Sequence, residues 1–132
     1  MNSVIIAGSR TINDYNLIKS TIVESGFKID EIVCGCARGV DILGKKYGVE
    51  NNIPVIDFPA EWNNFKVQPL CIKTSVNGGK YNSFAGHIRN RKMAEYASHL
   101  ILIWNGFSSG SASMRKLAKQ YGLTIFEKML AD

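Results

Sequence analysis

The sequence predicts an α/β fold in which a five-stranded parallel sheet carries helices on both faces. Short apolar runs of strand length alternate along the 132 residues with segments of helical period. Three of these runs lead directly into turns that combine glycine with arginine or serine, at 8–10, 35–41 and 105–111. Strand–helix alternation implies right-handed crossovers, and we expect the strand order 3-2-1-4-5.

The first half of the chain is predicted to contain three strands and two helices. The strands are expected at 3–8, 31–35 and 54–58, and the helices at 14–25 and 39–51. Asn13 or Asp14 is predicted to cap the first helix, which ends at Gly26. In the second helix, Gly44 and Gly48 are expected to let the backbone approach the sheet closely.

The second half begins with an irregular passage at 59–84, rich in glycine, proline and asparagine and without a sustained period. A small hairpin is expected around Gly78, and the passage is either a lid or rim over a site or a plain surface insertion. The remaining elements are expected to be helices at 85–97 and 110–121 and strands at 99–104 and 123–127. The inward faces of these helices are predicted to carry Met93, Tyr96, Ala97, Met114, Leu117, Ala118 and Tyr121.

The composition is typical of a single folded domain over residues 1–132, with 45% hydrophobic and 20% charged residues. The net charge of +5 fits either an anionic partner or a solvated basic surface. No apolar stretch approaches the roughly 20 residues of a membrane helix, so no membrane partner is expected. The N-terminus leads straight into a strand without a charged leader, which predicts a cytoplasmic protein.

The cysteines and histidines predict neither a metal site nor a bound cofactor. Three cysteines are an odd number, which argues against a disulfide framework. Cys34 and Cys36 lack the two-residue spacing typical of zinc and redox motifs, and His87 and His99 lie far from them in the sequence. Cys34 is expected to end a buried strand, where cysteine behaves as a small hydrophobe.

The turn after the first strand is the first candidate for binding an anion. Gly8 permits a sharp turn, Ser9 offers a hydroxyl and an amide, and Arg10 can bind a phosphate through two N–H groups of its guanidinium. An ordinary loop with a surface arginine is the alternative. In the expected strand order this turn lies beside the turn that follows 99–104, where ligands bind in open α/β sheets.

The second candidate is the glycine-bracketed turn that leads into the second helix. Gly35 and Gly39 flank Ala37 and Arg38, so the backbone N–H groups at the helix start are expected to point toward an anion. Asp41 lies in the first helical turn. It either complements the helix dipole or serves the ligand, by orienting Arg38 or by accepting from a ribose hydroxyl.

Arg89 and Asn90 continue the inward stripe of the helix at 85–97, one turn nearer its start. An arginine on a buried stripe implies either an anionic ligand or an internal ion pair, for instance with Asp41 or Asp57. We favour the ligand, because helix starts and strand carboxyl ends share one edge of such a sheet.

The turn before the last helix is the third candidate. Capping explains one serine there, whereas Ser109, Gly110 and Ser111 together look like a phosphate cradle. Trp62 and Trp104 lie at or beyond strand ends, where an indole ring either stacks on a base or packs at the rim. The sequence identifies no catalytic residue.

In this order the segments resemble the SLOG superfamily, and most closely its small YspA/cpYpsA-related members. The matching segments, which span nearly the whole chain, are 8–10, 35–41, 58–62, 85–93, 104–106 and 109–111. The resemblance implies a Rossmann-like three-layer fold that binds a nucleotide or a nucleotide-derived signal. An ADP-ribose derivative held by a sensor or sponge in phage–host conflict is one such case. By analogy it also implies a homo-oligomer.

Two alternative functions follow from more distant resemblances. The DprA family, whose members process DNA and load recombinase on single strands, is similar at 37–41, 89–91 and 109–111, which implies single-stranded DNA binding. The LOG phosphoribohydrolases cleave an N-glycosidic bond with a glutamate in the helix after the last loop. Residues 112–115 are Ala, Ser, Met and Arg here, which argues against the same hydrolysis. A hydrolase of this kind would have to use Asp41 or Glu61 as its carboxylate.

Overall fold

Seven strands and four helices occur along residues 1–130, the part of the chain that the computed structural model describes. In chain order they are β1 (Ser3–Gly8), α1 (Tyr15–Ser25), β2 (Glu31–Cys34), α2 (Val40–Glu50), β3 (Val55–Asp57), β4 (Ile72–Thr74), β5 (Lys80–Asn82), α3 (Ala85–Tyr96), β6 (His99–Trp104), α4 (Ser109–Gln120) and β7 (Thr124–Met129). The boundaries predicted for the five main strands and the four helices lie within about two residues of these.

Five strands form one parallel sheet in the order β3-β2-β1-β6-β7, which confirms the predicted order. The central strand, β1, pairs with β2 on one side and with β6 on the other, so that Ile5 lies opposite Val33 and Leu100. At the carboxyl end of β1, Gly8 is paired with Ile103 of β6. The strand order reverses between β1 and β6, and their ends form the edge where a ligand site is expected.

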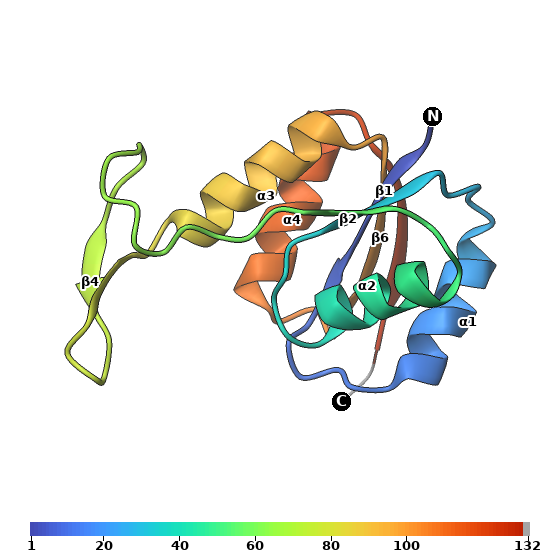
Figure 1. Ribbon diagram of the computed structural model, residues 1–132, viewed down its shortest axis with the longest axis horizontal. Helices are drawn as coiled ribbons and strands as arrows, with labels where there is room; N and C mark the ends of the chain where they lie inside the picture. The colour runs from blue at the N-terminus through green and yellow to red at the C-terminus, as the bar shows by residue number, and fades with distance from the viewer. Residues whose placement is uncertain (131–132) are drawn as a thin grey trace.

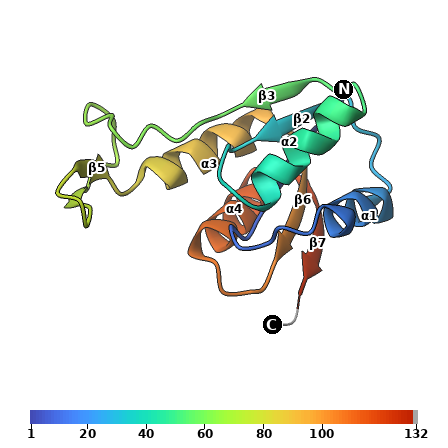
Figure 2. The ribbon, with the colours of Figure 1, turned by 60° about the horizontal axis from the view of Figure 1, so that its bottom comes forward.

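Helices cover both faces of this sheet, as Figures 1 and 2 show. Alternate residues of β1 point to opposite faces, as the strand period requires. Val4 and Ile6 pack in the core on the side of α1 and α2, while Ile5 and Ala7 pack in the core on the side of α3 and α4. The architecture is therefore the expected Rossmann-like sandwich. None of the four described helices is long and apolar enough to cross a bilayer.

Local sequence explains how the first two helices begin, end and pack. Asp14 caps α1 by accepting a hydrogen bond from the Leu17 amide at 3.2 Å, and Gly26 ends the helix at φ 68°. A methyl group at Gly44 would approach the side chain of Ile6 to 2.7 Å, which no core side chain tolerates without moving. The expected close packing of α2 on the sheet is confirmed.

Two aromatic residues predicted to face inward do not. Tyr96 and Tyr121 are 46% and 44% exposed, whereas Ala94 is buried in the core beside Met93. The Tyr96 hydroxyl is hydrogen-bonded to Glu31 at 2.5 Å, and the Tyr121 hydroxyl donates to Glu95 at 3.0 Å. Each ring lies at the edge of the helix layer because its hydroxyl needs a polar partner.

The irregular passage contains the predicted hairpin, in which β4 and β5 pair antiparallel around Gly78. We call residues 66–82 the arm, because Figures 1 and 2 show that this segment projects away from the five-stranded sheet, beyond the start of α3. The fully buried side chain of Asn82 secures its base by accepting from the Cys71 amide and donating to the Pro69 carbonyl. The tip of the arm is a surface insertion, and only its base approaches the sheet edge.

Candidate functional site

A cavity of about 830 Å³ lies at the carboxyl ends of β1 and β6, at the switch point. It is enclosed by the turn after β1, the first residues of α2, α3 and α4, and the base of the arm. A second hollow of about 550 Å³ shares Arg10, Ala37, Trp62 and Arg89 with the cavity and extends along the turn after β2. The three glycine-containing turns therefore meet at one edge of the sheet.

Most of the residues predicted to form the site line one of these two hollows. The cavity is lined by Gly8, Arg10, Ala37, Asp41, Trp62, Arg89, Asn90, Ser109, Gly110 and Ser111. Gly35 and Arg38 line the second hollow. Arg10, Arg38 and Arg89, which are far apart in the sequence, thus surround one continuous concave surface.

Ser9 and Gly39 line neither hollow, and the structure gives them a different position. Ser9 is buried, and its carbonyl accepts from the amides of Ile12 and Val40, both at 3.4 Å. Gly39 has a φ of 81°, and a methyl group there would lie 2.7 Å from the Arg10 carbonyl. These two residues hold the turn after β1 against the start of α2. They therefore fix the position of two segments that line the site, without lining it themselves.

Arg89 lines both hollows and is fixed by hydrogen bonds to protein atoms. Its Nη1 donates to the Gly35 carbonyl, and its Nε donates to the Asn90 Oδ1 at 2.9 Å. Burial lowers its pKa below the usual value, an effect that the charge of Asp41 partly offsets. Among residues 1–130 it forms no ion pair within 4.0 Å, so the internal salt bridge considered for it is not present.

Asp41 is 5% exposed and is the only acidic side chain that lines the cavity in the described part of the chain. Its Oδ2 accepts from the Ala37 amide at 3.3 Å. Burial raises the pKa of this carboxyl to about 6, although Arg89, two backbone amides and Arg10 act in the opposite direction. The carboxyl can therefore change its charge near neutral pH, directly beside the cationic wall of the site.

The start of α4 presents polar groups to the cavity without pairing all of them. The Ser108 side chain caps the helix by accepting from the Ser111 amide at 3.3 Å. The Ser109 and Gly110 amides have no acceptor within the helix, as is general for a first turn. The Ser111 hydroxyl is buried, lines the cavity and has no hydrogen-bond partner among the described residues.

The two tryptophans have different environments. Trp62 is 38% exposed, lines both hollows and meets Tyr81 edge-on with ring centroids 6.1 Å apart. Trp104 is buried in the core, and its Nε1 donates to Glu127 at 2.7 Å. Trp62 can thus offer a ring to a ligand, whereas Trp104 packs the interior.

The cavity also contains residues that sequence reasoning did not select. His87 and Ser113 line it and are hydrogen-bonded to each other through Nδ1 and Oγ at 3.1 Å. His87 precedes Asn90 and Met93 by steps of three residues, so extending the inward stripe of α3 by one turn would have found it. Ser113 carried no comparable signal.

Glu61, the other carboxylate considered for catalysis, lies outside the cavity. Its Oε2 accepts from the Asn64 side chain at 3.1 Å, and its Oε1 lies 3.8 Å from the Lys92 Nζ. Among residues 1–130 the cavity therefore holds one carboxyl group, while Arg10 and Arg89 line it and Arg38 lines the adjoining hollow. This charge distribution suits an anion, and the described residues do not form the paired carboxylates typical of glycosidic-bond cleavage.

Comparisons with known proteins relate the first part of the chain to a sequence family and the whole chain to a known fold. The model of the YspA, cpYpsA-related SLOG family matches residues 2–65. The fold is similar to the X-ray structure of DNA processing protein A (DprA) from Streptococcus pneumoniae, with a TM-score of 0.70 and 18% identity over 96% of this chain and 50% of that one. The chain thus spans half the length of DprA, and no curated protein matches it. Residues 2–65 thus carry the sequence of the YspA/cpYpsA-related SLOG family, as the motifs of the chain predicted.

Proposed function

We propose that the cavity binds a nucleotide or a nucleotide-derived signalling molecule and that the protein acts as a sensor or sponge for it. One observation carries the proposal. The Ser111 hydroxyl is buried in the cavity wall without a partner, next to the free amides at the start of α4. A buried polar group is costly unless it is hydrogen-bonded, and a phosphate oxygen would satisfy it.

The phosphate subsite we propose lies between α4 and the arginines. The positive end of the helix dipole and the Ser109 and Gly110 amides favour an anion there. Arg89 is already oriented by the Gly35 carbonyl and Asn90, so little side-chain entropy is lost when it contacts a ligand. Both polar atoms of Asn90 are engaged within the protein, since its Nδ2 donates to the Gly110 carbonyl at 3.3 Å. Its role is to position Arg89 and α4.

The nucleoside would occupy the side of the cavity nearer the base of the arm. Trp62 supplies an aromatic face for a base, and Asp41 can accept a hydrogen bond from a ribose hydroxyl. A volume of about 830 Å³ lies within the ordinary range of small-molecule sites, roughly 300–1,000 Å³. An ADP-ribose derivative acting in phage–host conflict is the specific ligand and setting that the family resemblance leads us to propose.

Ligand release and thermal unfolding test this function. Purified protein is denatured and the released small molecules are identified by mass spectrometry, and ligand-free protein is then screened against a panel of nucleotides. We expect a nucleotide in the wild type, a rise in melting temperature with it, and loss of both in Arg89→Ala. Arg91→Ala is the matched control, because Arg91 lies on the same helix, lines neither hollow, and among residues 1–130 has Glu95 as its one ion-pair partner. Wild-type protein that releases nothing and responds to no nucleotide would refute the proposal.

Single-stranded DNA binding is the second candidate, and the charge of the arm and of α3 favours it. No acidic residue occurs between Glu61 and Glu95, and this stretch contains six cations: Lys66, Lys73, Lys80, Arg89, Arg91 and Lys92. Binding to phosphates by such a surface would weaken steeply with salt. A fluorescent oligonucleotide titrated at low and high salt tests this, and no binding at low salt would exclude it.

A further inference from the structure

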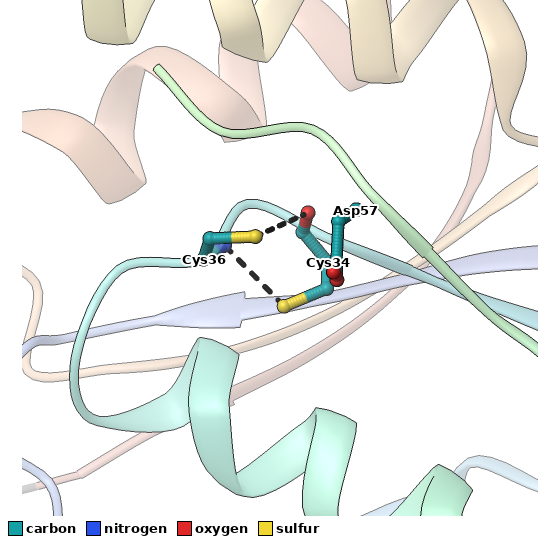
Figure 3. A group of neighbouring side chains, drawn as sticks. All are labelled: Cys34, Cys36 and Asp57. Atoms are coloured by element: carbon teal, nitrogen blue, oxygen red, sulfur yellow. Dashed lines mark hydrogen bonds between the residues drawn. The ribbon is translucent and has the colours of Figure 1, made fainter.

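Two cysteines and an aspartate meet at the carboxyl ends of β2 and β3 (Figure 3), and one of them, Cys36, also lines the second hollow. Cys34 is the last residue of β2, Cys36 follows in the adjoining turn, and Asp57 is the last residue of β3. The Cys34 and Cys36 sulfurs and an Asp57 carboxylate oxygen all lie within 4.8 Å of one another. Parallel pairing places Cys34 directly opposite Asp57, so the sheet itself sets this spacing.

The backbone around these cysteines is held in an uncommon conformation. Cys36 has a φ of 64°, a region that residues with a side chain rarely adopt. This turn directs the Cys36 amide to the Cys34 sulfur at 3.3 Å, while the Cys36 sulfur lies 3.7 Å from the Cys34 carbonyl. An amide that donates to a sulfur stabilises a thiolate, and backbone strain of this kind is concentrated at functional sites.

Basic residues stand around the cluster. The Lys45 Nζ donates to Asp57 at 2.8 Å and its charge also acts on Cys36, while Arg89 lines the same hollow as Cys36. In the metal-free protein, burial raises the pKa of Cys34 to about 12 and also raises the pKa of Cys36, so both thiols carry their protons. Two thiolates and one carboxylate would hold three negative charges. A divalent cation together with Lys45 would neutralise them.

We propose that Cys34, Cys36 and Asp57 bind a thiophilic divalent cation, with Zn²⁺ as the natural occupant. Thiolates select zinc over magnesium and calcium, which prefer oxygen ligands. Tetrahedral zinc with bonds of about 2.0–2.3 Å separates its ligands by roughly 3.5–3.8 Å. The donor atoms lie within 4.8 Å of one another, so they would have to draw together by up to about 1.3 Å to hold it. Binding releases two thiol protons to solvent. Lys45 would remain hydrogen-bonded to Asp57 without contacting the metal.

The fourth coordination position would face the second hollow, because Cys36 lines that hollow together with Arg38 and Arg10. A three-residue zinc site with one open position accepts water or an anionic group of a solute. The site is distinct from the phosphate subsite at α4, and its occupancy does not depend on nucleotide binding. The spacing of the cysteines in the sequence did not indicate this site, because the third donor, Asp57, lies 21 residues beyond Cys36. The pairing of β2 and β3 brings it near.

Cobalt titration of the reduced, ligand-free protein tests this site. Co²⁺ bound by thiolates gives a charge-transfer band in the near ultraviolet and tetrahedral bands in the visible range, and Zn²⁺ should abolish both by competition. We expect Cys36→Ser to weaken Co²⁺ binding at least tenfold and to reduce the charge-transfer band, with Asp57→Asn weakening binding and keeping the band. Cys71→Ser is the control, because Cys71 is the third free cysteine and lies at the base of the arm.

The outcomes separate this site from the nucleotide site. Wild-type protein without a charge-transfer band, or a Cys36→Ser variant that keeps the full band, would overturn the zinc site. Loss of the band in Cys71→Ser would assign the metal to other ligands and would also overturn it. Circular dichroism of each variant without metal verifies that it is folded. If the protein binds a nucleotide but no cobalt, the zinc site is refuted and the proposed function stands. If it binds cobalt but no nucleotide, the proposed function is refuted and the zinc site stands.

Discussion

Replacing Asp41 by asparagine should make the ligand-free protein more stable at neutral and alkaline pH. Asp41 is buried beside the cavity, and its pKa is raised from 3.8 to about 6 in the folded protein. The folded state therefore holds the proton more tightly than the unfolded chain does. The contribution of Asp41 to the free energy of unfolding is therefore highest below about pH 4 and falls as the pH rises through 6.

The size of the effect follows from the pKa difference between the folded and unfolded states. A change of about two pKa units corresponds to about 3 kcal/mol of stability lost by the wild type between pH 4 and pH 8. Asparagine cannot ionise, so Asp41→Asn avoids this loss. We expect the variant to exceed the wild type by about 3 kcal/mol at pH 8 and by nearly nothing at pH 4.

Urea unfolding followed by circular dichroism at several pH values measures this difference. Other carboxyl groups titrate equally in both proteins, so subtracting the two curves isolates Asp41. Asp57→Asn is the matched control. It removes an exposed ion pair with Lys45, and because such pairs contribute little to stability, this variant should unfold close to the wild type at both pH values. An Asp41→Asn variant that is less stable than the wild type at pH 8, or a pH-independent difference, would refute the reasoning.

Two further variants test the wall of the cavity and the sheet edge. Ser111→Ala removes a buried hydroxyl that has no partner among the described residues, so the ligand-free protein should keep its stability within about 1 kcal/mol. Nucleotide affinity, measured by calorimetry, should fall at least tenfold. Unchanged affinity would contradict the phosphate subsite. Gly8→Ala would force a methyl group against the Ile103 carbonyl and should cost more than about 2 kcal/mol in urea unfolding, whereas Gly110→Ala meets nothing within 4 Å and should cost less than about 1 kcal/mol.

The sheet was predictable because its central strands are apolar runs. β1 and β6 are buried on both faces, so each is apolar after its first residue, and glycine or asparagine marks its end. The helices were predictable from capping and periodicity, with Asp14 as the clearest case. Periodicity alone could not place Tyr96 and Tyr121, because an aromatic residue with a hydroxyl group fits a boundary as well as a core.

The site was predictable where its residues follow strands directly and unpredictable where it depends on packing between distant elements. Arg10, Arg38 and Arg89 converge because strand and helix ends share one edge of the sheet, a consequence of topology. Ser113 faces His87 only because α3 and α4 pack side by side. The same holds for Asp57 beside Cys34, which requires the pairing of β2 with β3.

Anomalous diffraction from crystals soaked in tungstate, a phosphate mimic, tests the central claim most directly. The account predicts a tungsten peak in the cavity, with an oxyanion oxygen within hydrogen-bond distance of the Ser111 hydroxyl and the Gly110 amide, and with Arg89 beside it. A cavity without a peak, or tungstate bound only to the lysines of the arm, would contradict the claim that the three turns form one anion site.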